Sequence, residues 1–187
     1  MTISDARYIE APNELSFKQE LTPETWGRPV DLPGASVFLA GGITGCEEWQ
    51  RPMARKLLAA TKSLVVVNPR RDNFPIDDPN AAEAQITWEH DALRFVSAVS
   101  VWFTNATMQP ICLYELGAWS MTRKPLFVGV QPGYAREQDV RIQTRLARPE
   151  VVIVDNIDDL CAQIVAYANS HTIRHEGFGN PRPDGLY

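Results

Sequence analysis

Glu115 is the residue whose neighbours most clearly suggest chemistry. It lies in the run Ile111–Met121, flanked by Leu113, Leu116 and Ala118. An ionised carboxylate is costly to bury among apolar side chains unless it is paired or functional. A solvated glutamate on a helix surface is the alternative that this residue alone leaves open. If it is buried at a site, such a carboxylate can act as a nucleophile or as a general acid or base.

Asp91 is a second carboxylate that we expect near the same edge of the fold. It follows His90 near the end of the helical run Ala81–Phe95. Two carboxylates at one pocket can divide their roles, because one can attack carbon while the other moves a proton. His90 is a weaker acid–base candidate, since a histidine there is expected to face solvent.

A glycine pair, Gly41 and Gly42, follows a short apolar run that ends at Ala40. Glycine tolerates positive φ and lets the backbone approach a ligand closely, although a plain tight turn is the alternative. The segment is neither a G-x-G-x-x-G fingerprint nor a P-loop with its lysine. A dinucleotide or ATP site is therefore not indicated.

Short apolar runs alternate with helical patterns along most of the chain. The expected strands are residues 37–40, 64–67, 98–103, 126–130 and 151–154. The expected helices are residues 47–60, 81–95, 111–121, 137–146 and 157–168. Five β–α alternations predict an α/β fold with one Rossmann-like, five-stranded parallel sheet and helices on both faces. Ligands of such sheets bind beyond the carboxyl ends of the strands, so the segments after residues 40, 67, 103 and 130 should surround one pocket.

The expected organisation is a single catalytic domain with two appended segments. Residues 1–34 contain four prolines and no sustained periodicity, so we expect a loosely structured N-terminal arm on the surface. Residues 35–170 form the domain, and residues 171–187 form a tail rich in glycine and proline.

Composition excludes several classes of partner. The chain has 187 residues and a net charge of -5, which argues against a nucleic-acid or membrane surface as the main partner. No apolar run approaches the ~20 residues needed to span a bilayer. The three cysteines match no zinc pattern, and we expect free thiols in a reducing cytoplasm. No metal site and no signal peptide are predicted.

Four segments together resemble the nucleoside 2-deoxyribosyltransferase family. They are V-F-L-A-G-G-I-T from residue 37, V-N-P-R-R from residue 67, W-E-x-D-A-L from residue 88 and P-I-C-L-Y-E-L-G-A from residue 110. The resemblance implies a flavodoxin-like fold, no cofactor, and a homo-oligomer built from dimers that complete each other's sites. Its expected partners are nucleosides and free nucleobases. It also implies transfer of 2-deoxyribose between bases through a covalent glycosyl-glutamate.

The resemblance assigns roles to individual residues. The nucleophilic glutamate falls on Glu115, and the aspartate that orients the sugar and protonates the base falls on Asp91. A base-binding aspartate is replaced by Gln109, with Asn105 as a nearby substitute. A tyrosine of the first strand is replaced by Phe38.

Further substrate contacts are expected from three more positions. Asp139 stands where the family places an asparagine on the sugar 5′-hydroxyl, often from the neighbouring subunit. The carboxylate of the terminal Tyr187 is expected to reach into an active site. Arg70 is a candidate substrate contact that keeps a phosphate-bearing substrate possible.

Three functions remain open on the sequence. The first is a transferase that exchanges bases on 2-deoxyribonucleosides. The second is a hydrolase of nucleosides or nucleoside 5′-monophosphates that uses the same glutamate. Asp139 favours nucleosides because a carboxylate accepts a hydroxyl proton but repels a phosphate. The third is a small-molecule binding module without turnover.

Overall fold

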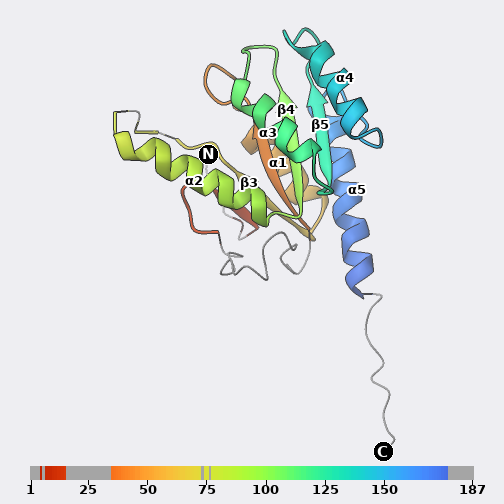
Figure 1. The fold of residues 1–187 in the computed structure, drawn as a ribbon. Coiled ribbons are helices and arrows are strands. Elements are labelled where there is room, and N and C mark those ends of the chain that lie inside the picture. The colour runs from red at the N-terminus through yellow and green to blue at the C-terminus, as the bar shows by residue number, and fades with distance from the viewer. Residues whose placement is uncertain (1–4, 6, 16–34, 73, 76, 177–187) are drawn as a thin grey trace, which may run out of the picture.

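The computed structural model describes residues 5, 7–15, 35–72, 74–75 and 77–176. The strands are β1 (Tyr8–Glu10), β2 (Ala35–Gly41), β3 (Leu64–Asn68), β4 (Ala98–Phe103) and β5 (Leu126–Val130). The helices are α1 (Gln50–Ala60), α2 (Pro79–Phe95), α3 (Pro110–Ser120), α4 (Glu137–Ala147) and α5 (Ile157–Glu176). The strands form one all-parallel sheet in the order β1-β3-β2-β4-β5 (Figure 1). The expected α/β, flavodoxin-like fold is confirmed.

The two central strands form the middle of the core. Every residue of β2 and of β4 is buried, as expected for parallel strands that are covered on both faces. The two strands pair directly, with Phe38 opposite Val99 and Ala40 opposite Val101. Alternate side chains of each strand therefore enter the two separate apolar clusters on either side of the sheet.

Helices cover both faces of this sheet. Helices α1 and α5 pack on one face, where Met53 and Leu57 lie in the same cluster as Leu160 and Ile164. Helices α2, α3 and α4 lie on the other face (Figure 1). They contribute buried side chains to the apolar cluster there. Both candidate carboxylates of the sequence therefore lie on helices of one face.

The fifth strand is not the one that the apolar pattern predicts. Residues 151–154 form no strand, and only Val154 makes an isolated bridge to Gly129. Instead Tyr8–Glu10, inside the expected arm, pairs with β3 at the edge of the sheet. This strand has three residues and one fully buried side chain, Ile9, so it carries no apolar run by which it could be found. The buried guanidinium of Arg51 holds it in place through both carboxylate oxygens of Glu10.

Three further expectations concern the described part of the chain. Cys46, Cys112 and Cys161 are free, as expected. None of its helices combines the length and the apolar character that crossing a bilayer requires. Helix α5 runs past the expected end at residue 168 to Glu176. The segment 16–34 of the expected arm lies outside the described residues.

Candidate active site

A pocket of about 400 Å³ opens beyond the carboxyl ends of the strands. The chain leaves β2 for β3 on one side, while β4 lies on the other side, so the strand order reverses between β2 and β4. Ligands of open α/β sheets bind at this switch point. The pocket is lined by Phe38, Ala40, Gly41, Gly42, Ile43, Thr44, Pro69, Glu89, Thr107, Met108, Gln109, Pro110, Ile111, Cys112 and Glu115. The segments after β2, β3 and β4 thus meet as expected, whereas the segment after β5 contributes none of these residues.

The turn after β2 brings backbone against side chains at the pocket wall. A Cβ on Gly42 would lie 2.5 Å from Sγ of Cys46 and 2.8 Å from Cδ of Gln109. The indole nitrogen of Trp49 donates to the carbonyl oxygen of Gly42 at 3.0 Å and fixes the turn. The side chains of Cys46 and Gln109 lie so close to the backbone of residue 42 that only glycine fits there.

Gln109 sets the start of the helix that carries Glu115. It has left-handed backbone angles, φ 51 and ψ 57, and Pro110 follows it as the first helical residue. Its amide nitrogen donates to the carbonyl oxygens of Thr104 at 2.6 Å and Thr107 at 3.2 Å. The side chain thereby ties the loop after β4 to the beginning of α3.

Glu115 lines the pocket from α3 and is partly buried. No hydrogen-bond donor within the described ranges reaches its carboxylate. Burial raises the pKa of Glu115 to about 7, and the negative charge of Glu89 adds to the rise. A carboxyl group with a strongly raised pKa in a pocket is typical of functional sites.

Glu89 of α2 is the second carboxylate of this pocket. Gln85, one helical turn earlier, donates from one amide nitrogen to Glu89 Oε1 and to the carbonyl oxygen of Pro69, both at 2.8 Å. Burial raises the pKa of Glu89, and the hydrogen bond from Gln85 opposes this rise. Sequence reasoning missed Glu89, although its spacing of four from Gln85 on one helix face was a signal that could have found it.

Asp91 does not line the pocket with Glu89 and Glu115. Successive residues of an α-helix are turned by about 100° around its axis, so residues two positions apart differ by about 200°. Glu89 and Asp91 therefore point in nearly opposite directions. The Asp91 carboxylate lies 3.5 Å from Nδ1 of His90, and His90 is exposed. The catalytic role expected for Asp91 stays a prediction.

The other charged groups near the pocket are engaged elsewhere. Arg70 donates to the backbone carbonyl oxygens of Glu47 at 3.0 Å and Cys46 at 3.2 Å, and to the side chain of Gln50. Among the described residues that line the pocket there is no lysine, arginine or histidine. Burial raises the pKa of Cys112 to about 12, with a further contribution from the charge of Glu115, so this thiol stays neutral. No cluster of three potential metal ligands occurs within the described ranges.

The comparison with protein families agrees with this geometry. Residues 34–134 match the family model "Nucleoside 2-deoxyribosyltransferase like", and this segment is more than half of the 187 residues. The chain belongs to this family. The comparison with curated proteins found no match. Every residue that lines the pocket falls inside the segment matched by the nucleoside 2-deoxyribosyltransferase-like family.

Some of the predicted substrate-binding residues line this pocket, and others do not. Phe38, Gly41, Gly42 and Gln109 line it. Asn105 does not, and its amide nitrogen donates instead to the carbonyl oxygen of Pro132 at 3.1 Å.

Asp139 and Tyr187 lie beyond the matched segment. Asp139 is on α4, where its carboxylate pairs with Arg136 at 3.1 Å, and it is not among the residues that line the pocket. Tyr187 lies outside the described residues. Their expected contacts with substrate stay predictions.

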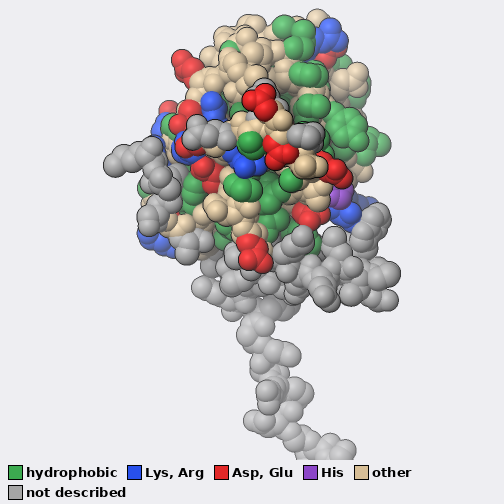
Figure 2. All heavy atoms as spheres, turned by 90° about the vertical axis from the view of Figure 1, so that its left-hand side faces the viewer, with side chains coloured by type: hydrophobic (Ala, Val, Ile, Leu, Met, Phe, Trp, Pro, Cys, Tyr) green, Lys and Arg blue, Asp and Glu red, His purple; other side chains and the backbone are tan. Residues whose placement is uncertain are grey.

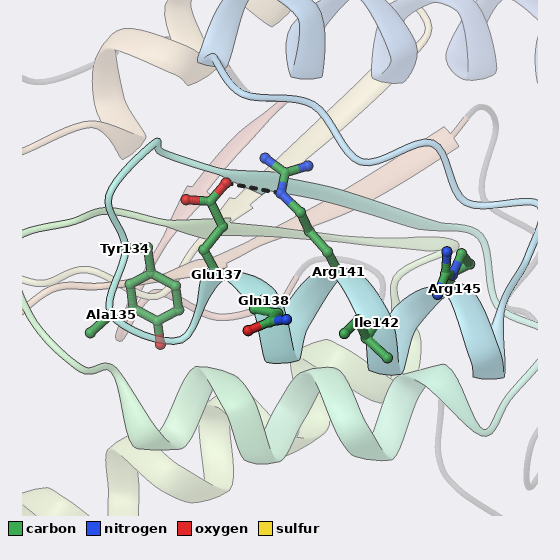
Figure 3. A pocket seen from close by; sticks show the side chains of 7 residues that line it. All are labelled: Tyr134, Ala135, Glu137, Gln138, Arg141, Ile142 and Arg145. Atoms are coloured by element: carbon green, nitrogen blue, oxygen red, sulfur yellow. Dashed lines mark hydrogen bonds and ion pairs between the residues drawn. The ribbon is translucent and has the colours of Figure 1, made fainter.

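A second, more open depression of about 640 Å³ lies along α4 and shares no residue with the pocket of Glu115. Figure 3 shows Glu137 and Arg141 on the same side of α4, pointing toward one another and joined by an ion pair of 3.0 Å. Arg141 also pairs with Asp155, so its charge is already balanced. The depression offers no nucleophile beside an acid or base, and the candidate site remains the pocket of Glu115.

Proposed function

We propose that this protein is a nucleoside 2-deoxyribosyltransferase that exchanges bases on 2-deoxyribonucleosides. The observation that carries this proposal is the placement of Glu115. Its carboxylate faces a pocket at the switch point of the sheet, with no hydrogen-bond donor among the described residues. A partly buried carboxylate with no donor among the described residues is poorly suited to a structural role and well suited to covalent attack.

The chemistry follows from this carboxylate. One oxygen of Glu115 attacks C1′ of the sugar while the bond from C1′ to the base breaks, through a transition state with oxocarbenium character. The product is a glycosyl ester on Glu115. A second base then attacks C1′ and releases the carboxylate, provided that water is excluded. If water attacks instead, the same pocket acts as a hydrolase.

The composition of the pocket supports nucleosides over nucleoside monophosphates. Two carboxylates line it, and no cationic side chain does so among the described residues. A phosphate dianion would meet unfavourable charge there, whereas a neutral nucleoside would not. The remaining lining is largely apolar, which suits the face of a base and of a deoxyribose.

We also propose that a second copy of the chain covers α3. Ile111, Tyr114 and Met121 are 65%, 77% and 82% exposed, and with the exposed Ala118 they recur every three or four residues. Figure 2 shows hydrophobic side chains gathered at the upper right of that view, the side on which α3 lies. Ile111 also lines the pocket. A contiguous apolar stripe of this kind is typical of a protein interface.

The test is a base-exchange assay on the full chain. The protein is incubated with 2′-deoxyinosine, with and without free adenine, and the products are separated by chromatography. We expect 2′-deoxyadenosine only when adenine is present. Intact-protein mass spectrometry without an acceptor base should show one added deoxyribosyl group.

Glu115→Gln should abolish both signals. Glu83→Gln is the matched control, because Glu83 is an exposed glutamate of α2 outside the pocket. Release of free deoxyribose as the sole product would identify a hydrolase instead. Ligand binding without any turnover would overturn both enzymatic assignments.

A further inference from the structure

The pocket holds two carboxyl groups, while the proposed attack on C1′ uses only one of them. Glu89 projects from α2 and Glu115 from α3, and both line the same cavity. Glu89 is close enough to Glu115 for its charge to oppose the ionisation of Glu115. Two carboxyl groups with different roles are the arrangement that glycosidic cleavage requires.

Glu89 is held so that one oxygen is engaged and the other is available. Gln85 Nε2 donates to Glu89 Oε1 and to the carbonyl oxygen of Pro69. Because the carbonyl can only accept, this contact fixes which end of the amide faces Glu89. Gln85 is therefore a positioning residue, and Oε2 of Glu89 is left to meet a ligand.

The only other titratable group that lines the cavity, within the described ranges, is Cys112 of α3. The lining residues after β2 and β3, such as Thr44 and Pro69, carry no charge. With no cation at the wall, two negative charges in one small cavity repel each other, and the pair favours holding one proton between them. Positive charge that develops on the sugar then draws the negative charge to Glu115 and leaves the proton on Glu89.

We infer that Glu89, rather than Asp91, is the catalytic acid and base of this site. This inference rests on the proposed function. In the first step Glu115 bonds to C1′, the bond from C1′ to the base nitrogen breaks, and the proton of Glu89 goes to a ring nitrogen of the leaving base. In the second step the Glu89 carboxylate takes a proton from the incoming base as that base attacks C1′ and Glu115 leaves.

The test compares leaving groups that do and do not need a proton. In N7-methyl-deoxyguanosine the base is already cationic and departs without protonation, whereas the base of deoxyinosine is neutral. Glu89→Gln should lower kcat/KM for deoxyinosine by ~10²-fold or more, the usual scale for a general acid, and should change it far less for the cationic nucleoside. Asp91→Asn should leave the ratio between the two substrates at its wild-type value. Glu83→Gln is the control for the same chemical change on an exposed position of α2.

A pH profile gives a second readout that a purely structural role would not change. For deoxyinosine, wild-type kcat/KM should fall on the alkaline side as the pair loses its proton, and Glu89→Gln should remove this limb. Gln85→Leu should retain the limb and move it to higher pH, because the donor that favours ionised Glu89 is gone.

Three outcomes overturn the inference. In the first, Glu89→Gln affects both nucleosides equally while its melting temperature matches the wild type. In the second, the selective loss follows Asp91→Asn. In the third, Glu89→Gln fails to fold, and the alkaline limb of the Gln85→Leu pH profile stays where it is in the wild type. If the wild type cleaves neither nucleoside, the proposed function itself fails, and this result is distinct from the other three.

Discussion

Burial in the pocket removes part of the hydration of the Glu115 carboxylate, and Glu89 places a negative charge near it. Both effects disfavour its ionised form, yet covalent attack requires that form. The same residue therefore lowers the stability of the fold near neutral pH and supplies the proposed chemistry. This trade-off between stability and function is common at active sites.

Glu115→Gln should stabilise the protein at pH 8 and not at pH 4. The pKa of Glu115 is about 7 in the folded state against 4.5 for the unfolded chain, so stability falls as pH rises through this window. The neutral amide escapes this loss, which we put at about 1–3 kcal/mol after allowing for partial exposure. Urea titrations at both pH values measure it. An equal change at both would contradict the pKa shift.

At the scale of elements, the buried Arg51 of α1 links the edge strand β1 to the segment after β3. The Arg51 guanidinium contacts Glu10 of β1 at 2.5 and 2.9 Å and Asp72 after β3 at 3.0 Å. Arg51 is only 6% exposed, so water screens its ion pair with Glu10 poorly, whereas Asp72 is largely exposed. β1 pairs with β3, and β3 leads directly to Pro69 at the pocket wall.

Arg51→Ala should release β1 from the sheet. Removal of one partner from a buried pair leaves an uncompensated charge, so we expect a loss of about 3–5 kcal/mol. Hydrogen exchange should speed up most at residues 8–10. Lys56→Ala is the matched control, because the pair of Lys56 with Asp158 is exposed and should contribute little. Equal effects of the two substitutions would show that Arg51 does not hold β1 on the sheet.

Substitution by alanine should have opposite effects on stability at two glycines, Gly41 and Gly117. A Cβ on Gly41, at the end of β2 with φ +154, would lie 2.4 Å from the backbone oxygen of Trp102 and 2.4 Å from Cζ2 of Trp49. Gly41→Ala should therefore cost about 2 kcal/mol or more. A Cβ on Gly117 in α3 meets nothing within 4 Å, so Gly117→Ala should stabilise the helix by about 0.5–1 kcal/mol. Thermal unfolding of both variants checks the signs.

At the scale of the whole molecule, the exposed stripe on α3 lies beside the mouth of the pocket. Met108 and Ile111 line the pocket and are 51% and 65% exposed. A second copy packed on this stripe would cover that mouth and exclude water. The ratio of base exchange to hydrolysis should then depend on association.

Ile111→Glu should dissociate the proposed oligomer. Ile86 of α2 is the matched control, since it is an isoleucine with 64% exposure against 65% for Ile111 and does not line the pocket. Light scattering coupled to size-exclusion chromatography should report a lower mass for Ile111→Glu and no change for Ile86→Glu. A monomeric wild type, or dissociation by Ile86→Glu, would contradict the placement of the interface on α3.

Much of the fold and part of the site could be predicted from the sequence alone. The four longer strands are continuous apolar runs, and the turn glycines and Glu115 lie in local patterns that do not depend on distant residues. The tertiary structure decided the rest. The three-residue β1 is recognisable only through its pairing with β3 and its contact with Arg51, which lie far along the chain. Which of Glu89 and Asp91 lines the pocket depends on how α2 is rotated on the sheet. That rotation is set by packing of the whole helix and not by the type of either residue.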